Sequence, residues 1–317
     1  MRSGSKADAH ERLCAVSVDL DEVPCYTAIH GLTQLPEASR HAVYRHALPR
    51  LAELFAQLEV PATFFAIGRD LVHQHAHDAL RALAQAGHEI GNHSQDHWYD
   101  LTQHSRAEMR AQVADAAHNI ERATGSAPRG FRAPGYTITD ELFAVLQELG
   151  VVYDSSVFPC PAYYGLKVAA IRSYQLRGRP THSVVDHPRV LSAPTEPYRI
   201  GTPYTRRGTG LLELPIGVTR TVTGRLPFIG TSVIMAGRRG ASLLCRAMTG
   251  RRLINLELHG IDAADAQLDG LTALQRAQPD LRMSARDKLA VLEHTLLELR
   301  AAGYRFVTLE TAARAFS

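Results

Sequence analysis

The sequence Leu13-Cys14-Ala15-Val16-Ser17-Val18-Asp19-Leu20-Asp21 is a β-branched, apolar run that ends on two aspartates. Such a run is typical of a strand buried in a sheet. Strand geometry would point the carboxylates of Asp19 and Asp21 to the same side, toward one site. Two neighbouring carboxylates can divide the work of a hydrolytic site, one binding a cation and the other accepting a proton from water. The alternative is that one of them only caps the following turn.

Short apolar runs alternate with amphipathic segments along the rest of the chain. Strands are predicted at 61–68, 88–92, 130–132, 151–153, 211–215, 253–258 and 306–309, and helices at 38–58, 76–86, 105–123, 139–149 and 284–302, with a short helix at the end. Ser105, followed three residues later by Glu108, is a capping-box pattern at the start of one helix. Alternation of strands and helices at this spacing predicts an α/β fold with a parallel sheet or barrel.

Composition places the chain among globular proteins. Its 317 residues exceed the usual domain size, yet one α/β barrel of about 250 residues fits within them. The chain is 45% hydrophobic, which is ample for a large core, and its net charge of +3 is too small to indicate nucleic-acid binding. The four cysteines have no Cys-x-x-Cys spacing, so neither a zinc knuckle nor a redox motif is predicted.

The first residues and the hydropathy of the chain indicate where in the cell the protein is expected. The first ten residues carry charge and lack the apolar segment of a signal peptide. No stretch approaches the roughly 20 apolar residues that a membrane span needs. We therefore expect a cytoplasmic protein in which residues 1–11 are a disordered tail and residues 12–317 form a single domain.

Two segments depart from the strand–helix alternation. Residues 155–210 are rich in Pro, Tyr, Arg and Gly, and we expect a long insertion with short strands that acts as a lid or substrate platform. Residues 226–240 pair an apolar run with arginines. That segment either contacts a membrane surface peripherally or is a barrel helix that packs on the core.

The segment His93-Ser94-Gln95-Asp96-His97 follows the strand predicted at 88–92. Histidines four residues apart share one face of a helical turn, so both rings can reach one cation. With Asp21 as a third ligand they would leave open positions for water and substrate, as in hydrolytic metal sites. The alternative is a helix with two surface histidines. Trp98 and Tyr99 follow directly and are predicted to wall the site, unless one of them only packs in the core.

Two further strand ends carry chemically useful residues. In Arg132-Ala133-Pro134-Gly135-Tyr136, the arginine can hold a catalytic carboxylate by a bidentate bond, and the Pro-Gly bend can turn the Tyr136 N–H toward a developing oxyanion. His259 ends the run Leu256-Glu257-Leu258-His259 and would suit a general acid. Asp262 either orients that ring or caps the next turn. The alternative for residues 132–136 is a loop without a catalytic role, and the alternative for His259 is a histidine that only packs in the core.

In order and spacing, these four elements resemble the polysaccharide deacetylases, also called carbohydrate esterase family four or the chitooligosaccharide deacetylase homology domain, from about Leu13 to Ala315. The resemblance implies a distorted (β/α) barrel and a metal-dependent amide hydrolase. It implies the following roles: Asp19 as general base, Asp21, His93 and His97 as ligands of a divalent metal, commonly zinc, Arg132 as tether of Asp19, Tyr136 as donor of an oxyanion N–H, and His259 as general acid.

The sequence also departs from the commonest family pattern. Residues 19–22 read Asp-Leu-Asp-Glu in place of adjacent aspartates followed by Gly. This variant looks like the branch that holds intracellular peptidoglycan-deacetylase-like proteins and metal-independent imide and allantoin hydrolases. The later Asp-Trp motif of the family is missing, and only Glu213 stands near its place.

The resulting prediction is a hydrolase that removes an N-acetyl or N-formyl group from an amino sugar. Its substrate is expected to be a small molecule or glycan, such as a nucleotide- or lipid-linked sugar or a precursor in glycan or antibiotic assembly, contacted by Trp98 and Tyr136. One alternative is a cyclic-imide or ureide amidohydrolase on the same fold. Another alternative is a non-catalytic carbohydrate-binding protein. The presence of both a candidate base and a candidate acid argues against it. No oligomeric state is predicted.

Overall fold

A nine-stranded sheet organises the chain in this computed structural model, which describes residues 11–33, 35–178, 181 and 183–317. The predicted disordered tail therefore lies almost wholly outside the described residues. The strands are β1 (Leu13–Asp19), β2 (Ala62–Ala66), β3 (Glu89–Asn92), β4 (Gly130–Phe131), β5 (Tyr153–Asp154), β6 (Tyr198–Ile200), β7 (Arg207–Glu213), β8 (Leu253–His259) and β9 (Arg305–Val307). Their order is β6-β7-β5-β4-β3-β2-β1-β8, and β9 also pairs with β1.

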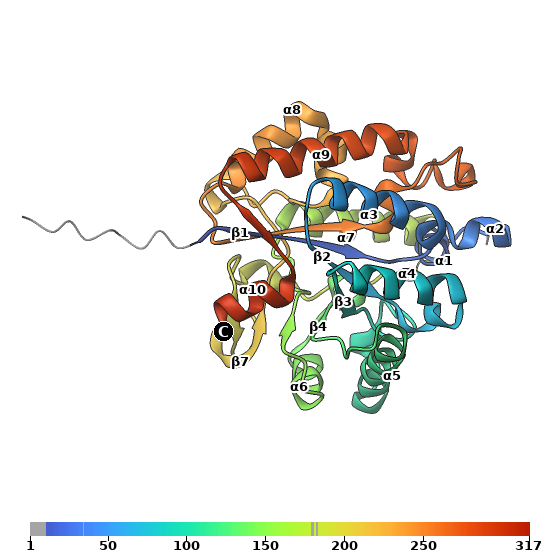
Figure 1. Ribbon diagram of the computed structural model, residues 1–317. Coiled ribbons are helices and arrows are strands. Elements are labelled where there is room, and N and C mark those ends of the chain that lie inside the picture. Colours follow the sequence, from blue (N-terminus) through green and yellow to red (C-terminus); the bar gives the residue numbers. More distant parts are fainter. Residues whose placement is uncertain (1–10, 34, 179–180, 182) are drawn as a thin grey trace, which may run out of the picture.

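Most of the helices pack around the outside of the sheet. They are α1 (Val23–His30), α2 (Glu37–Arg40), α3 (Leu48–Gln57), α4 (Gln74–Gln85), α5 (Arg106–Thr124), α6 (Asp140–Glu148), α7 (Pro161–Leu176), α8 (Gly230–Met248), α9 (Ala285–Ala301) and α10 (Leu309–Phe316). Figure 1 shows α3, α8 and α9 stacked on one side of β1 and β2, with α5 and α6 at the opposite end of the molecule.

The described strand pairs are parallel, except that β6 and β7 are antiparallel. The sheet curls, but its two end strands, β8 and β6, do not pair with each other. The predicted fold class, a distorted (β/α) barrel, is confirmed as an incompletely closed barrel.

Alternate residues of β1 face different surroundings although the whole strand is buried. Val16 and Val18 belong to the large apolar core beneath the outer helices, whereas Leu13 and Ala15 belong to an interior cluster that α10 closes. Ser17 and Asp19 follow in the same phase as Leu13 and Ala15, so they also face the interior. The barrel interior is thus apolar at its base and polar at the carboxyl ends of the strands.

Several predicted elements are confirmed, with small shifts. The capping box is present, because the Ser105 hydroxyl accepts the Glu108 N–H and the Glu108 carboxylate accepts the Ser105 N–H. The helix predicted at 38–58 is instead divided into α2, a π-helical turn at Val43–Ala47, and α3. The buried Glu22 carboxylate accepts the N–H groups of Val43 and Tyr44, which satisfies the start of this helical stretch.

The 155–210 insertion is the main correction to the predicted elements. In place of only short strands it contains α7, a helix of 16 residues with Pro161 in its first turn and Cys160 as its cap. No side chain of α7 is fully buried, so the helix lacks the stripe of core-packing residues by which a sequence pattern indicates a helix.

The 226–240 segment leads into α8, whose Val233 and Ile234 are buried in the core. The interpretation of this segment as a packing helix therefore holds. In the part of the chain that the structure describes, no helix is long and apolar enough to cross a membrane.

Candidate active site

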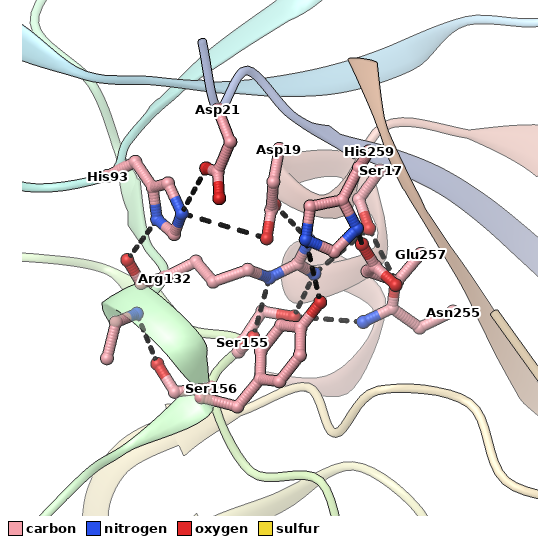
Figure 2. A network of polar contacts seen from close by, with 12 residues as sticks. Ser17, Asp19, Asp21, His93, Arg132, Ser155, Ser156, Asn255, Glu257 and His259 are labelled. Carbon is pink, nitrogen blue, oxygen red and sulfur yellow. Dashed lines mark hydrogen bonds and ion pairs between the residues drawn. The ribbon is translucent and has the colours of Figure 1, made fainter. Parts of the chain in front are cut away.

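The predicted site residues converge at the carboxyl edge of the sheet. Asp19 ends β1 and lies beside His259, the last residue of the neighbouring β8. His93 follows β3, and Arg132 follows β4. Because these strands are parallel and adjacent, their carboxyl ends meet, and the side chains face one another across the end of the barrel (Figure 2).

Asp21, His93 and His97 form one compact group of possible ligands. Asp21 Oδ1 lies 3.3 Å from His93 Nε2 and 3.1 Å from His97 Nε2. All three side chains are buried. Their ligand atoms lie within 4.8 Å of one another, close enough to bind one ion.

The helical turn predicted for 93–97 is wrong, although both rings do reach the same point. Ser94 and His97 have φ values of 63° and 55°, so the chain makes a tight left-handed turn in place of a helix. The Asn92 side chain accepts the Ser94 N–H, and the Ser94 hydroxyl accepts the His97 N–H. These local bonds stabilise a backbone conformation that is unfavourable for residues with a side chain.

The hydrogen-bonding of this group fits a cation. His93 Nδ1 lies 2.7 Å from the Arg132 carbonyl oxygen, which can only accept, so this nitrogen donates and the neutral ring would present the lone pair of Nε2. His97 Nε2 and Asp21 Oδ1 are buried and have no hydrogen-bond partner among the residues that the structure describes. Burial also lowers the pKa of His97, which favours the neutral ring that ligates a metal. Lone pairs directed at one point repel unless a cation lies between them.

Arg132 holds Asp19 from the barrel interior. Its guanidinium is fully buried, and Nη1 donates to Asp19 Oδ1 at 2.7 Å. The other donors bond the Ser155 carbonyl and the hydroxyls of Ser17 and Ser155, so the contact with Asp19 is a single bond and the predicted bidentate pair is wrong. Asp19 Oδ2 is left 3.7 Å from His93 Nε2, beside the group of possible metal ligands.

Glu257 is a functional residue that the sequence analysis missed. Its carboxylate is fully buried, and Oε1 lies 2.9 Å from His259 Nδ1. Burial alone would lower the pKa of His259, but the Glu257 carboxylate outweighs it and raises that pKa well above its ordinary value. The alternation Leu256-Glu257-Leu258-His259 was the available signal, because residues two apart on a strand share a face.

Tyr136 is placed differently from the prediction. Its N–H donates to the Ala133 carbonyl at 3.0 Å, because Pro134–Tyr136 closes a 3₁₀ turn with that bond. This N–H is therefore not free for an oxyanion. The hydroxyl of Tyr136 instead lies 3.4 Å from His259 Nε2, inside the site.

A cavity of about 440 Å³ opens above these groups. Asp19, Asp21, His93, Tyr136 and His259 line it, together with side chains of α1, α7 and the segment before α8. The structure does not bring Trp98 to this cavity, because its indole stacks on His104 with ring centroids 4.4 Å apart. Tyr99, the next residue, lines the cavity instead.

Two acidic residues of uncertain role in the sequence lie outside the cavity. Asp262 accepts the His259 N–H at 2.9 Å, so it caps the following turn and does not orient the ring. Glu213 is fully buried beside Asp154 and accepts the Val157 N–H. Burial and the Asp154 carboxyl raise the pKa of Glu213 well above its ordinary value.

Parts of the chain are similar in sequence to known deacetylases. Residues 41–153 match the sequence profile described as polysaccharide deacetylase. Over 151 residues the chain is 27% identical to the peptidoglycan deacetylase of Helicobacter pylori, covering 47% of this chain and 50% of that protein. Over 104 residues it is 34% identical to a chitooligosaccharide deacetylase of Bradyrhizobium, covering 32% of this chain and 46% of that protein. The chain thus spans about half the length of these curated relatives.

A solved structure supports the fold over nearly the whole chain. The crystal structure of a Mycobacterium smegmatis protein assigned as a polysaccharide deacetylase superposes with a TM-score of 0.58, at 20% identity, covering 96% of this chain and 90% of that one. The resemblance to the polysaccharide deacetylases is therefore confirmed, in sequence over residues 41–153 and in fold over most of the chain.

Proposed function

We propose that this protein is a metal-dependent hydrolase that removes an N-acetyl or N-formyl group from an amino sugar. The observation that carries the proposal is that the ligand group Asp21, His93 and His97 lies against Asp19 and His259 at one end of the barrel. A base, an acid and a cation site in one cavity are the requirements of amide hydrolysis. The names of the relatives, deacetylases of peptidoglycan and chitooligosaccharide, support the choice of an amino sugar.

In this proposal Asp21, His93 and His97 hold a divalent cation, and zinc suits a set of two imidazoles and one carboxylate. When bound, such a cation polarises the acyl oxygen as a Lewis acid and makes water more acidic. Asp19 takes a proton from the attacking water, while the hydrogen bond from Arg132 orients the Asp19 carboxylate.

His259 completes the reaction as general acid. Its ring is kept protonated by Glu257 and faces the cavity beside the Tyr136 hydroxyl. As the carbon–nitrogen bond breaks, His259 gives its proton to the leaving nitrogen, so that a free amine and acetate or formate are released. The Tyr136 hydroxyl, in place of its N–H, is the group available to bond the reacting oxygen or nitrogen.

A substrate screen tests the proposal. Purified protein would be assayed for release of amine from N-acetylated and N-formylated amino sugars, and in parallel for hydrolysis of allantoin and succinimide. We expect activity on the amino sugars that is lost with a chelator and restored by zinc. Protein that holds no metal by plasma spectrometry and is unaffected by the chelator would refute the metal-dependent proposal.

The same screen decides between the proposed function and its alternatives. The cyclic-imide or ureide alternative was suggested by the Asp-Leu-Asp-Glu variant. The Glu22 of this variant does not line the cavity, and its carboxylate accepts the N–H groups of Val23, Val43 and Tyr44. The hydrogen bonds that Glu22 accepts thus explain its presence in the variant by a local structural role. Hydrolysis of allantoin or succinimide alone would nevertheless favour the alternative, and no hydrolysis with retained sugar binding would favour a binding protein.

We further propose a cytoplasmic nucleotide- or lipid-linked sugar as the substrate. In favour of a lipid-linked form, Leu226 and Met235 are exposed by 44% and 53%, and Arg238 and Arg239 are exposed nearby. Exposed apolar residues next to cations are the composition of a peripheral membrane contact. Flotation with anionic liposomes tests this contact, and absence of binding would remove the lipid-linked version.

A further inference from the structure

Helix α7 supplies one wall of the active-site cavity. Tyr163, Leu166, Lys167 and Ala170 line the cavity, and their spacing places them on one face of the helix. This helix lies outside residues 41–153, the part that matches the polysaccharide deacetylase profile. The contacts that α7 offers a substrate therefore lie outside the part of the chain that the family profile covers.

Lys167 is the charged residue of this wall. Its Nζ donates to the Gly135 carbonyl oxygen at 2.8 Å, and in the part of the chain that the structure describes it forms no ion pair with a carboxylate. An ammonium group has three donors, and this bond uses one of them. Burial lowers the pKa of Lys167 to about 8, partly opposed by the more distant Asp186, so the group is still mainly protonated at pH 7.

The other charged groups of the cavity already have partners. Asp19 is bonded to Arg132, Asp21 lies between the two histidines, and His259 is paired with Glu257. Lys167 is half-buried, and the only opposite charge that acts on it among the described residues is the more distant Asp186, so its charge is incompletely compensated. An anion that enters the cavity would restore the missing interaction at Lys167.

We propose that Lys167 binds an anionic group of the substrate, a carboxylate or a phosphate, so that the substrate is an acidic N-acyl amino sugar. This inference rests on the proposed function and narrows its substrate class. The position is suitable, because Lys167 Nζ bonds the residue directly before Tyr136, whose hydroxyl reaches His259. A sugar with its amide at the catalytic groups would present a neighbouring substituent to Lys167.

Binding titrations in the Asp19→Asn background test the proposal without turnover. The probes are N-acetylglucosamine 1-phosphate, N-acetylmuramic acid, and the neutral methyl glycoside of N-acetylglucosamine, each measured by calorimetry with zinc present. We expect at least one anionic probe to bind about tenfold or more tightly than the neutral probe. The two anionic probes distinguish a phosphate from a carboxylate as the group that is recognised.

Three variants separate charge from structure. Lys167→Gln retains a donor for the Gly135 carbonyl but removes the charge, and it should abolish the preference for the anionic probe. Lys167→Arg should retain most of the preference. Arg172→Gln removes an exposed cation from the same helix and should leave all affinities unchanged.

The outcomes that contradict the proposal are distinct from failure of the proposed function. Equal binding of charged and neutral probes, binding of none of them, or an equal loss for all probes in Lys167→Gln would overturn the role of Lys167. Absence of deacetylation by the wild-type protein, with the charge preference present and dependent on Lys167, would refute the proposed function and leave anion binding in place.

Discussion

At the scale of single residues, the site depends on charges that are removed from water and stabilise one another. Arg132 is wholly buried and compensated by Asp19, and Glu257 is wholly buried and compensated by His259. Deletion of one partner leaves an uncompensated buried charge, which is far more costly than loss of a surface ion pair. Conservative changes that keep the volume are therefore the informative variants.

Asp19→Asn removes the proposed base while keeping the shape of the side chain. We expect kcat to fall by about 10²–10⁴-fold, the contribution typical of a general base. Zinc content should be unchanged, because Asp21, His93 and His97 are intact. Rates of amine release and plasma spectrometry on the same preparation measure both quantities. Turnover equal to that of the wild-type protein would rule out Asp19 as base.

Glu257→Gln should change the pH dependence of catalysis. A general acid must be protonated, so activity falls as pH rises through the pKa of His259. Glu257 raises that pKa, and its removal should move the alkaline limb of kcat/KM to lower pH. Glu213→Gln alters a buried carboxyl outside the cavity and serves as the control. An alkaline limb at the same pH in both variants would contradict a positioning role for Glu257.

Lys167 should also affect stability as a function of pH. Its pKa is about 8 in the folded protein, against an ordinary value of 10.5, so the unfolded chain binds more protons between these values. Stability of the wild-type protein should therefore rise from pH 8 to 10.5 relative to Lys167→Gln. The groups that act on Lys167 are the Asp186 carboxylate and the ring of Tyr163. Denaturant unfolding across this range measures the difference, and parallel curves would refute the lowered pKa.

At the scale of elements, sequence patterns predicted the helices and strands that bury a stripe of apolar residues or begin with a capping residue. The start of α5 follows from Ser105 and Glu108, and β1 and β8 follow from their apolar runs. Helix α7 was missed because none of its residues is fully buried, so no stripe of core-packing residues marks it in the sequence. One of its faces lines the cavity instead.

The capping box of α5 offers a test at this scale. Ser105→Ala removes the acceptor for the Glu108 N–H and should lower the free energy of unfolding by about 1 kcal/mol. Activity should not change, because none of the cavity-lining residues belongs to α5. Urea denaturation measures the effect, with Ser126→Ala, an exposed serine just after the helix, as the control. A larger loss for the control would contradict the capping assignment.

At the scale of the whole molecule, the ligand group links strands that are distant in sequence. Asp21 follows β1, and His93 and His97 follow β3, so a bound cation would join two segments of the barrel. A ligand that binds only the folded state stabilises it by about 2.7 kcal/mol at 100 times its Kd. We therefore expect zinc to raise the melting temperature.

The corresponding variant is His97→Ala, which should abolish the zinc-dependent rise in melting temperature. His104→Ala removes a histidine that stacks on Trp98 outside the cavity and should retain the rise. Differential scanning calorimetry with and without zinc provides the measurement. A rise that persists in His97→Ala would show that the ion binds elsewhere.

The sequence by itself determined the barrel and the edge at which its chemistry lies. Apolar runs predict parallel strands, and Asp19, Arg132 and His259 come at strand ends, which meet at one edge of any such sheet. Only the tertiary structure decided which groups are free to act. The Tyr136 N–H is used by a turn and Trp98 stacks on a neighbour, whereas Glu257 and Lys167 reach the site. A sequence pattern indicates which face of an element is buried and where the element ends. Hydrogen-bond partners and cavity walls arise instead from segments that folding brings together.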